Sequence, residues 1–304
     1  MEDEPFYHVD APYFSVVVPT YNRERFISKT LRSIADQVFQ DFEVIVVDDC
    51  STDNTVAEVQ PFLKDNRFQL LLNSTNSERA VSRNRGMMAA KGKFLTLLDS
   101  DDLMYPYCLQ DAYDFSKGHP EYKFFRNYYD IKDREGKLLR VQKKVAADYL
   151  KLIAKENFLS CIGVFMEREI YARFFFDEDR RIIRSEDWEL WLRIMADYKL
   201  HTIPKVNSTY TYHSGRSMEK VEPREIEQRK MLVINKTLRN SKVYQAHELD
   251  MKVSAMIFVA VQSNEAKMPK SAFAYLAKAS RISFIKSMQF RFFVALKNAL
   301  QNSF

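Results

Sequence analysis

With 304 residues and a mass of 35.9 kDa, the chain is long enough for one large α/β domain with appendages or for two small domains. Hydrophobic residues make up 46% and charged residues 29%, which is ordinary for a soluble globular protein, and 6 Gly and 9 Pro exclude collagen-like and Gly- or Pro-rich classes. Cys50, Cys108 and Cys161 are too widely spaced for a zinc pattern or a disulfide framework, which favours a reducing compartment. Residues 1–10 lack the apolar core of a secretory signal, and no apolar run reaches the roughly 20 residues that span a bilayer. The sequence therefore predicts a cytoplasmic protein.

The net charge of +5 is concentrated near the end of the chain. Residues 262–304 contain seven Lys and Arg side chains and one acid, Glu265, so the remainder is close to neutral. A basic tail on a near-neutral body indicates an acidic partner surface: anionic lipid, nucleic acid or another subunit.

The first hundred residues alternate between two hydrophobic periods. Helical spacing predicts a first helix over 25–38, a second that begins after a cap at Ser51, and a third over 79–90. Short, almost entirely apolar runs predict buried strands at 14–18, 42–47, 68–72 and 94–98. Such alternation is typical of a parallel sheet covered on both faces, whose ligands bind at the carboxyl ends of the strands.

The pattern is looser after Asp102. The predicted helices are 106–117, 146–155, 187–196 and a helical region from about 219 onward. The predicted strands are 122–131, 138–141, 161–166, and a pair, 200–203 and 206–212, joined near Pro204.

Polar residues follow the first two predicted strands. Pro19, Thr20 and Tyr21 come after the first, where neither a Gly-rich turn nor a P-loop is present, since the first glycine is Gly86. Tyr21 could stack on a base and Thr20 could donate a hydrogen bond; the alternative is a capped turn into the next helix. After the second strand, one carboxylate of the pair Asp48-Asp49 could accept from the imino N–H of uracil, or both could bond to loop amides.

Three carboxylates follow the fourth strand, in the segment Asp99-Ser100-Asp101-Asp102. Clustered carboxylates after an apolar strand are costly unless a cation neutralises them, and oxygen ligands suit Mg²⁺ or Mn²⁺ bridging to a diphosphate. The alternative is a solvated acidic turn. Arginines in the segment 79–86 could hold phosphate oxygens near this cluster or lie in solvent, and Gly86 would let their helix approach the sheet closely.

Four segments together resemble the family 2 glycosyltransferases of the GT-A fold, of the inverting, bacterial surface-polysaccharide type. They are residues 15–23, 41–49, 82–86 and 92–102. The resemblance implies an α/β fold with a mainly parallel central sheet flanked by helices, plus a helical C-terminal extension. The expected organisation is a tail at 1–11, a glycosyltransferase domain at 12–218, with a nucleotide-binding half at 12–105 and an acceptor half at 106–218, and an extension at 219–304.

The same resemblance assigns roles in the donor site. It implies that Asp49 contacts uracil and that the turn from Pro19 to Tyr21 lines the nucleoside. In the segment Asp99-Ser100-Asp101, the last carboxylate would hold the metal and the first would lie near the ribose or the metal. Arg83 would lie near the donor, with Arg79 a weaker candidate. Cys50 stands where the family usually has Gly, which removes no catalytic group.

A Glu186-Asp187 pair begins the predicted helix that also carries Trp188 and Trp191. The resemblance implies that Asp187 is the general base that deprotonates the acceptor hydroxyl. The alternative is a carboxylate that only stabilises the helix N-terminus. The two tryptophans would pack under the site or stack on a sugar, with core packing expected for at least one of them.

The segment 210–217 resembles the closing segment of the family. Thr211 occupies the usual Arg position, so Arg216 is a candidate substitute. His213 would complete the metal shell or touch the diphosphate; alternatively it is structural. Residues 214–223 could form a lid over the donor.

These features predict an enzyme that moves a sugar from a nucleotide-sugar, most simply a UDP-sugar, to a hydroxyl of a glycan or lipid-linked glycan, in polysaccharide or lipopolysaccharide assembly. Nucleic acid is not expected as a partner. A nucleotidyltransferase would need a Gly-rich loop after the first strand, which is absent here. A non-catalytic sugar-nucleotide or glycan-binding protein on the same fold stays open.

The tail adds an expectation about location. Its apolar residues recur at helical spacing among bases and could form an interfacial helix on the anionic inner face of the plasma membrane, or pack on the protein. The spacing residues are Phe284, Met288, Phe292, Leu296 and Leu300, widened by Phe290 and Phe293, with Lys286, Arg291 and Lys297 between or beside them.

Overall fold

The computed structural model describes residues 11–213 and 222–302. These residues form two compact units. The first unit comprises residues up to 143 together with 160–178 and 198–213, and the second comprises 144–159, 179–197 and the C-terminal residues from 222. Two segments from the middle of the chain thus group with the C-terminal helices, which no pattern in the sequence indicates.

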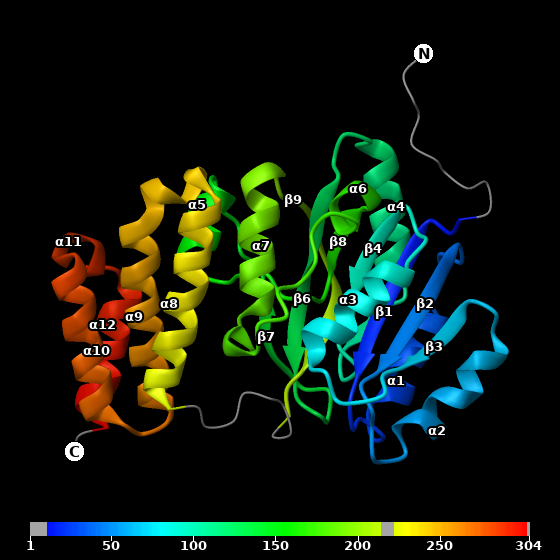
Figure 1. The fold of residues 1–304 in the computed structure, drawn as a ribbon, viewed down its shortest axis with the longest axis horizontal. Coiled ribbons are helices and arrows are strands. Elements are labelled where there is room, and N and C mark those ends of the chain that lie inside the picture. The colour runs from blue at the N-terminus through cyan, green and yellow to red at the C-terminus, as the bar shows by residue number, and fades with distance from the viewer. Residues whose placement is uncertain (1–10, 214–221, 303–304) are drawn as a thin grey trace. The chain divides into compact units, whose positions relative to one another are not determined.

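Four parallel strands form one half of the sheet in the first unit (Figure 1). They are β1 (Phe14–Thr20), β2 (Phe42–Asp48), β3 (Phe68–Leu72) and β4 (Phe94–Leu97), in the spatial order β3-β2-β1-β4. All four predicted strands are therefore confirmed. Strands β1 and β2 are apolar almost throughout because both faces of the sheet are covered.

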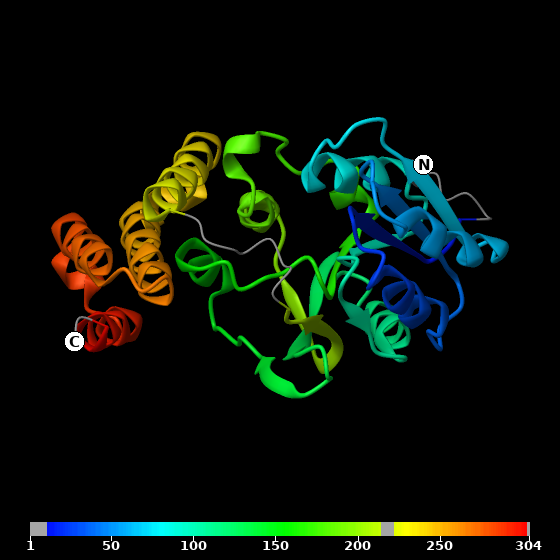
Figure 2. The same cartoon turned by 90° about the horizontal axis from the view of Figure 1, so that it is seen from below.

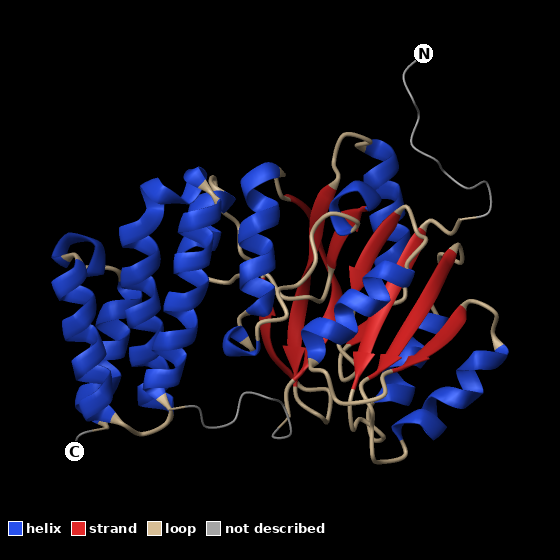
Figure 3. Ribbon diagram, in the orientation of Figure 1, coloured by secondary structure: helices blue, strands red, loops and turns tan. Residues whose placement is uncertain are grey.

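The other half of the sheet is mixed (Figure 3). It contains β5 (Leu103–Met104), β6 (Phe124–Lys132), β7 (Leu138–Gln142), β8 (Val164–Glu167) and β9 (His201–Thr211). β8 is antiparallel to both β4 and β6, whereas β9 is parallel to β6. The sheet is thus entirely parallel in its first half and mixed in its second. The strand β5 has only two residues, which is too short for a sequence pattern to predict.

The prediction of two strands joined near Pro204 is wrong, because β9 is continuous. Its register against β6 jumps from Thr202 opposite Arg126 to Val206 opposite Tyr128. Pro204, which has no N–H to donate, lies exposed in this irregularity. The proline therefore interrupts the ladder without ending the strand.

Helices cover both faces of the sheet in the first unit (Figure 2). α1 (Ile27–Ala35) and α4 (Cys108–Gly118) lie on one face and share a buried core with the even-numbered residues of β1, Val16 and Val18. α3 (Arg79–Ala89) lies on the other face, where a Cβ added to Gly86 would come within 2.3 Å of Val17 Cγ1. The predicted close approach of this helix to the sheet is confirmed.

Three short helices complete the first unit: α2 (Thr55–Val59), the 3₁₀ helix η1 (Gln60–Lys64) and α6 (Arg168–Tyr171). The predicted cap at Ser51 is wrong, because α2 begins only at Thr55. Ser51 instead donates its hydroxyl to Asp48 Oδ1 at 2.5 Å and its N–H to Asp48 Oδ2 at 2.9 Å. Its side chain is thus used to shape the loop after β2.

The second unit is helical. Its elements are α5 (Tyr149–Lys155), η2 (Arg180–Ile182), α7 (Glu186–Asp197), α8 (Pro223–Asn240), η3 (Lys242–His247), α9 (Glu248–Glu265), α10 (Pro269–Ile282), α11 (Phe284–Ser287) and α12 (Phe290–Gln301). Trp188 and Trp191 are both buried, so core packing is confirmed for both. Within the described part of the chain, no helix combines the length and the apolar character needed to cross a membrane.

Candidate functional site

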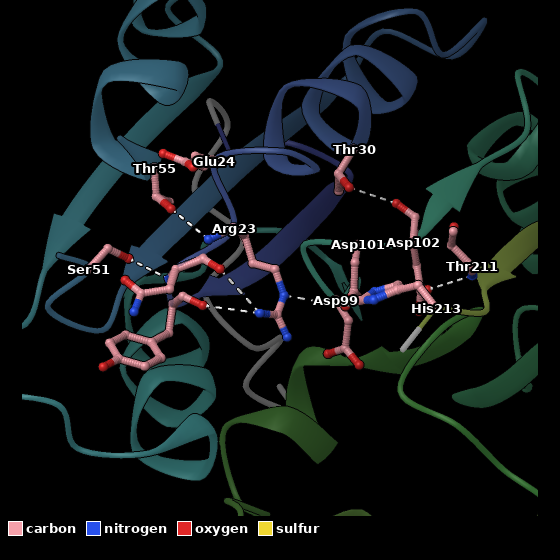
Figure 4. A network of polar contacts seen from close by, with 12 residues as sticks. Arg23, Glu24, Thr30, Ser51, Thr55, Asp99, Asp101, Asp102, Thr211 and His213 are labelled. Carbon is pink, nitrogen blue, oxygen red and sulfur yellow. Dashed lines mark hydrogen bonds and ion pairs between the residues drawn. The ribbon is translucent and has the colours of Figure 1, made fainter. Parts of the chain in front are cut away.

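The carboxyl ends of β1, β2 and β4 meet at one edge of the sheet. The register pairs Thr20 with Asp48, and Val17 with Leu97 two residues before Asp99. The loops that follow these strands therefore bring the predicted donor-site residues of the first unit to one place, part of which Figure 4 shows.

The turn after β1 is tied to the loop after β2. Asn22 adopts the left-handed region at φ 51°, donates its N–H to Ser51 Oγ at 2.9 Å and accepts the N–H of Thr52 at 2.8 Å. Arg23 donates its N–H to Thr55 Oγ1 at 2.7 Å. These contacts fix the turn without glycine, because an asparagine tolerates the left-handed conformation.

Two side chains of this turn, those of Thr20 and Tyr21, were predicted to line the nucleoside. Thr20 is almost fully buried, and its hydroxyl has no hydrogen-bond partner among the described residues. Tyr21, next to it, is 41% exposed. A buried hydroxyl without a partner is costly unless a ligand or water satisfies it, so this position is suited to a polar ligand group.

Both aspartates after β2 accept hydrogen bonds from loops, as the alternative interpretation of this pair anticipates. Asp49 Oδ1 accepts from Asn73 Nδ2 at 2.7 Å and from the N–H of Ser77 at 2.9 Å, and Oδ2 accepts from the N–H of Glu78 at 2.9 Å. A carboxylate offers about four acceptor positions, so the three bonds orient Asp49 and leave it able to accept one more donor.

Arg83 is held on α3 by two interactions. Its Nη2 donates to Asp99 Oδ1 at 2.8 Å, and its guanidinium lies 5.1 Å from the centre of the Phe176 ring. The neighbouring Asn84 donates to the carbonyl oxygen of Phe176 at 2.9 Å and accepts its N–H at 2.8 Å. The sequence reading missed this support, because nothing local links α3 to a segment 92 residues away.

The three carboxylates after β4 have different partners. Asp99 is partly exposed and pairs with Arg83, whereas Asp101 is buried and lies 3.4 Å from Arg23 Nε. Asp102 Oδ1 accepts the N–H of Thr211 at 3.0 Å. Thr211 thus contributes its backbone to this turn, although it stands where the family usually has an arginine side chain.

His213 lies beside Asp101. Its Nε2 is 3.0 Å from Asp101 Oδ2, and its ring is stacked on Phe26 with 4.4 Å between the ring centres. The side chain is fully buried. The structure therefore brings together two of the three predicted metal residues, Asp101 and His213.

The fit of a divalent cation rests on this pair. Among residues 11–213 and 222–302, no group of three or more His, Cys, Asp and Glu side chains is arranged as a metal site. Asp101 and His213 nevertheless offer an oxygen and a nitrogen donor side by side, which suits an ion whose other ligands come from a diphosphate and water. Asp99, the third predicted ligand, is engaged by Arg83.

Asp187 belongs to the second unit, in the first turn of α7. Its Oδ2 accepts from Asn157 Nδ2 at 2.9 Å, and its Oδ1 accepts the N–H of Trp188 at 2.7 Å. Asn157 fixes the carboxylate in one orientation, and no sequence signal pointed to it because it lies 30 residues earlier.

Lys230 of α8 interacts electrostatically with this carboxylate. Its Nζ lies 4.2 Å from the centre of a Trp188 ring and 4.9 Å from that of Phe258. Burial lowers the pKa of Lys230 to about 8, while Asp187 acts in the opposite direction. With Lys230 against the indole, Trp188 is a packing residue, and stacking of a sugar on it is not part of this arrangement.

Two predicted features lie outside the described residues. These are Arg216, the candidate substitute for the missing arginine, and most of the predicted lid.

Comparisons with known proteins point in one direction. Residues 15–175 match the family described as Glycosyl transferase family 2. The chain is 31% identical over 191 residues to UDP-Glc:alpha-D-GlcNAc-diphosphoundecaprenol beta-1,3-glucosyltransferase WfgD of Escherichia coli, which covers 62% of this chain and 72% of that protein.

Solved structures agree with this match in their fold. The crystal structure of S. aureus TarS 1-349 in complex with UDP-GlcNAc has a TM-score of 0.69 at 22% identity, covering 95% of this chain and 88% of the other. The mannosyltransferase PcManGT from Pyrobaculum calidifontis, in complex with GDP-Man and Mn²⁺, has a TM-score of 0.59 at 18% identity, covering 96% and 85%.

Proposed function

The chain belongs to glycosyl transferase family 2 and has the GT-A fold, and we propose that it transfers a sugar from a UDP-sugar to a hydroxyl of a glycan or lipid-linked glycan. The observation that carries the proposal is the edge of the sheet, where a buried hydroxyl, an oriented carboxylate and the pair Asp101–His213 follow three adjacent strands. The ends of parallel strands are where such folds bind nucleotides.

The nucleoside would contact the turn after β1. In this proposal Pro19, Thr20 and Tyr21 line it, with the Thr20 hydroxyl gaining the partner that it lacks among the described residues. Asp49 accepts the imino N–H of uracil with its remaining acceptor position, because the loop has already oriented its carboxylate. The names of WfgD and of the TarS complex, with UDP-Glc and UDP-GlcNAc, support a uridine donor.

Mg²⁺ or Mn²⁺ would be held by Asp101 and His213. The cation supplies Lewis-acid stabilisation of the leaving diphosphate. Arg23 Nε, 3.4 Å from Asp101 Oδ2, pairs with that carboxylate and holds it in place. The Mn²⁺ in the PcManGT complex supports a divalent ion, and the imidazole donor favours Mn²⁺, because Mg²⁺ takes almost only oxygen ligands.

Arg83 and Asp99 would act as a unit at the sugar end of the donor. The arginine is buried, so its role in this proposal is to hold Asp99, which is partly exposed and able to accept from a ribose or sugar hydroxyl. Ser100, between these two aspartates in the chain, would line the same nucleotide-sugar site.

Asp187 would take the proton of the acceptor hydroxyl as it attacks the anomeric carbon. Asn157 orients the carboxylate, and Lys230 interacts with it electrostatically. A single displacement with a base on the acceptor gives inversion at the anomeric carbon. The alternative, a carboxylate that only begins α7, predicts no effect on turnover when its charge is removed.

The setting would be the assembly of a surface polysaccharide or lipopolysaccharide. WfgD is named for an acceptor that is a sugar diphosphate on a polyprenol, which supports a lipid-linked acceptor here. A cytoplasmic location, peripheral on the inner face of the plasma membrane, belongs to this proposal.

The donor can be tested by thermal shift with UDP, GDP, ADP and dTDP, each with Mn²⁺, Mg²⁺ or EDTA. We expect the largest rise in Tm with UDP and Mn²⁺, and a smaller rise for Asp49→Asn, which cannot accept the imino proton as a carboxylate does. Equal shifts with all four nucleotides would contradict the uridine assignment.

A non-catalytic sugar-nucleotide-binding protein on the same fold is the second candidate. Asp101 and Asp187 are both present, and such a protein would need neither. UDP binding without UDP release from any UDP-sugar and acceptor tested would favour it.

A further inference from the structure

The last two helices of the second unit expose large apolar side chains. Phe284 and Ile285 of α11 are 66% and 85% exposed, and Phe290 at the start of α12 is 82% exposed. Met288 lies between them, and Phe293 and Val294 follow on α12, all exposed. These six residues are called the apolar end here; their helices are the red and orange-red ribbons of Figure 1.

α12 carries two apolar faces. Phe292, Ala295 and Ala299 are buried, and Asn264 of α9 donates to the carbonyl oxygen of Ala295 at 2.8 Å. Phe290 and Phe293 lie three residues apart, with Val294 next to the latter, and form a second face that is exposed. Packing of α12 thus buries Phe292 and leaves other apolar residues exposed.

Fewer unpaired bases surround the apolar end than the sequence alone indicates. Residues 266–304 contain no acid, but three of their bases pair with acids of earlier elements in the same unit. Lys278 pairs with Glu227, Lys286 with Asp250, and Arg291 with Glu156. The basic character that remains for a partner is thus smaller than the sequence suggests.

Arg281 and Lys297 are the bases that matter for a partner near the apolar end. Both are exposed, and neither forms an ion pair with the residues that the structure describes. Lys297 lies seven residues after Phe290, on the exposed face of α12, and Arg281 precedes α11 by three residues.

We propose that the apolar end docks on an anionic lipid surface, with its phenylalanines and Ile285 in the interface and Arg281 and Lys297 at the phosphates. Aromatic and branched side chains flanked by bases, without acids, are the chemistry that such interfaces select. A second copy of the chain fits less well, because residues 266–304 of that copy contain no acid that could pair with Arg281 or Lys297. An anionic lipid surface would account for the proposed location at the membrane. Only the biological role of this docking rests on the proposed function.

Because three of the bases are paired with acids, insertion of the apolar side chains should contribute most of the free energy of lipid binding. Arg281 and Lys297 are each expected to change the partition coefficient about fivefold. Raising the salt should therefore weaken binding without abolishing it, in contrast to a purely electrostatic contact.

The test is co-sedimentation of the full chain with vesicles of phosphatidylcholine alone or with 30% phosphatidylglycerol as the probe. We expect binding to the anionic vesicles, a loss of at least tenfold for Ile285→Ser/Phe290→Ser/Phe293→Ser, and a loss of about fivefold for Lys297→Gln. Val145→Ser is the matched control, because Val145 is 74% exposed but lies outside the apolar end. Stabilisation by UDP should be unchanged in all of these variants, which separates failure here from failure of the proposed function.

Each other outcome overturns the inference. Absence of binding at low salt, or equal binding by the triple variant, excludes the apolar end as a lipid contact. A wild-type dimer in light scattering that the triple variant converts to a monomer would assign the surface to a second copy instead. Circular dichroism verifies that the variants are folded, as expected for substitutions of exposed side chains.

Discussion

His213 and Asp101 are 3.0 Å apart between Nε2 and Oδ2, although 112 residues separate them in the chain. The contact links the end of β9 to the turn after β4, and the stacking of His213 on Phe26 fixes the imidazole. A carboxylate and an imidazole held together at the ends of the strands form the part of the site that would receive the cation and the diphosphate.

Replacement of Asp101 should remove metal-dependent binding. Asp101→Asn keeps the size but not the charge, so we expect loss of the extra Tm rise that Mn²⁺ gives with UDP, and a fall in turnover of about 10²-fold or more. Asp101→Ala should in addition destabilise the fold by about 3–5 kcal/mol, because it leaves Arg23 and His213 without their buried partner. Urea unfolding and thermal shift separate the two effects. Metal-dependent stabilisation that persists in Asp101→Asn would exclude the assigned ligand.

Replacement of Asp187 should affect turnover and not donor binding. Asp187→Asn can still accept from Asn157 but cannot take a proton, so we expect a loss of about 10²–10⁴ in turnover with UDP binding unchanged. Asp197→Asn, at the last residue of the same helix, is the matched control. If UDP binding is lost while turnover per bound donor survives, Asp187 is a donor-site residue and not the base.

Gly86 tests the packing of α3 on the sheet. Gly86→Ala places a Cβ 2.3 Å from Val17 Cγ1, so we expect destabilisation by about 1–3 kcal/mol in urea unfolding. Gly118→Ala is the control, because nothing lies within 4 Å of its added Cβ. That variant should be neutral or slightly stabilising, since it restricts the unfolded chain. Equal stability of the two variants would show that α3 does not pack as described.

Lys230 should make stability depend on pH in the alkaline range. Burial lowers its folded pKa to about 8 from an ordinary value of 10.5, so between these values the unfolded state binds more protons. The free energy of unfolding should therefore gain a contribution that rises with pH from about 8 to about 10.5. The charged groups that face Lys230 are Asp187, Glu186 and Arg229. The aromatic rings against which its ammonium group lies are those of Trp188 and Phe258.

The measurement is the difference in unfolding free energy between the wild type and Lys230→Met from pH 7 to pH 10. Methionine keeps the apolar stem between the two rings, and subtraction removes the titration of tyrosines and cysteines. A difference that is constant over this range would contradict the lowered pKa.

The sequence predicted the elements better than the contacts between them. Hydrophobic periodicity is local, and it located all four parallel strands, the helix beginning at Arg79 and the need for a glycine at Gly86. The break expected near Pro204 is absent because the proline interrupts pairing with β6 without ending the strand. The predicted cap at Ser51 is absent because its hydroxyl donates a hydrogen bond to Asp48 and does not cap a helix.

The sequence predicted which residues form the site, but not which of them contact one another. The carboxylates after β4 stood out by composition, but their partners Arg23, Arg83 and His213 come from three other elements. Likewise, Asn157 and Lys230 reach Asp187 only through the packing of α7 in the second unit. Such long-range pairings leave no periodic signal, so only the folded structure reveals them.

Sugar transfer by this chain is tested most directly by UDP release, measured with a panel of UDP-sugars and glycan or lipid-linked acceptors in the presence of Mn²⁺. We expect acceptor-dependent release by the wild type. It should be lost on chelation and in Asp101→Asn, and reduced about 10²–10⁴-fold in Asp187→Asn although UDP still binds. Release that is unaffected by chelation and by both substitutions would contradict this expectation.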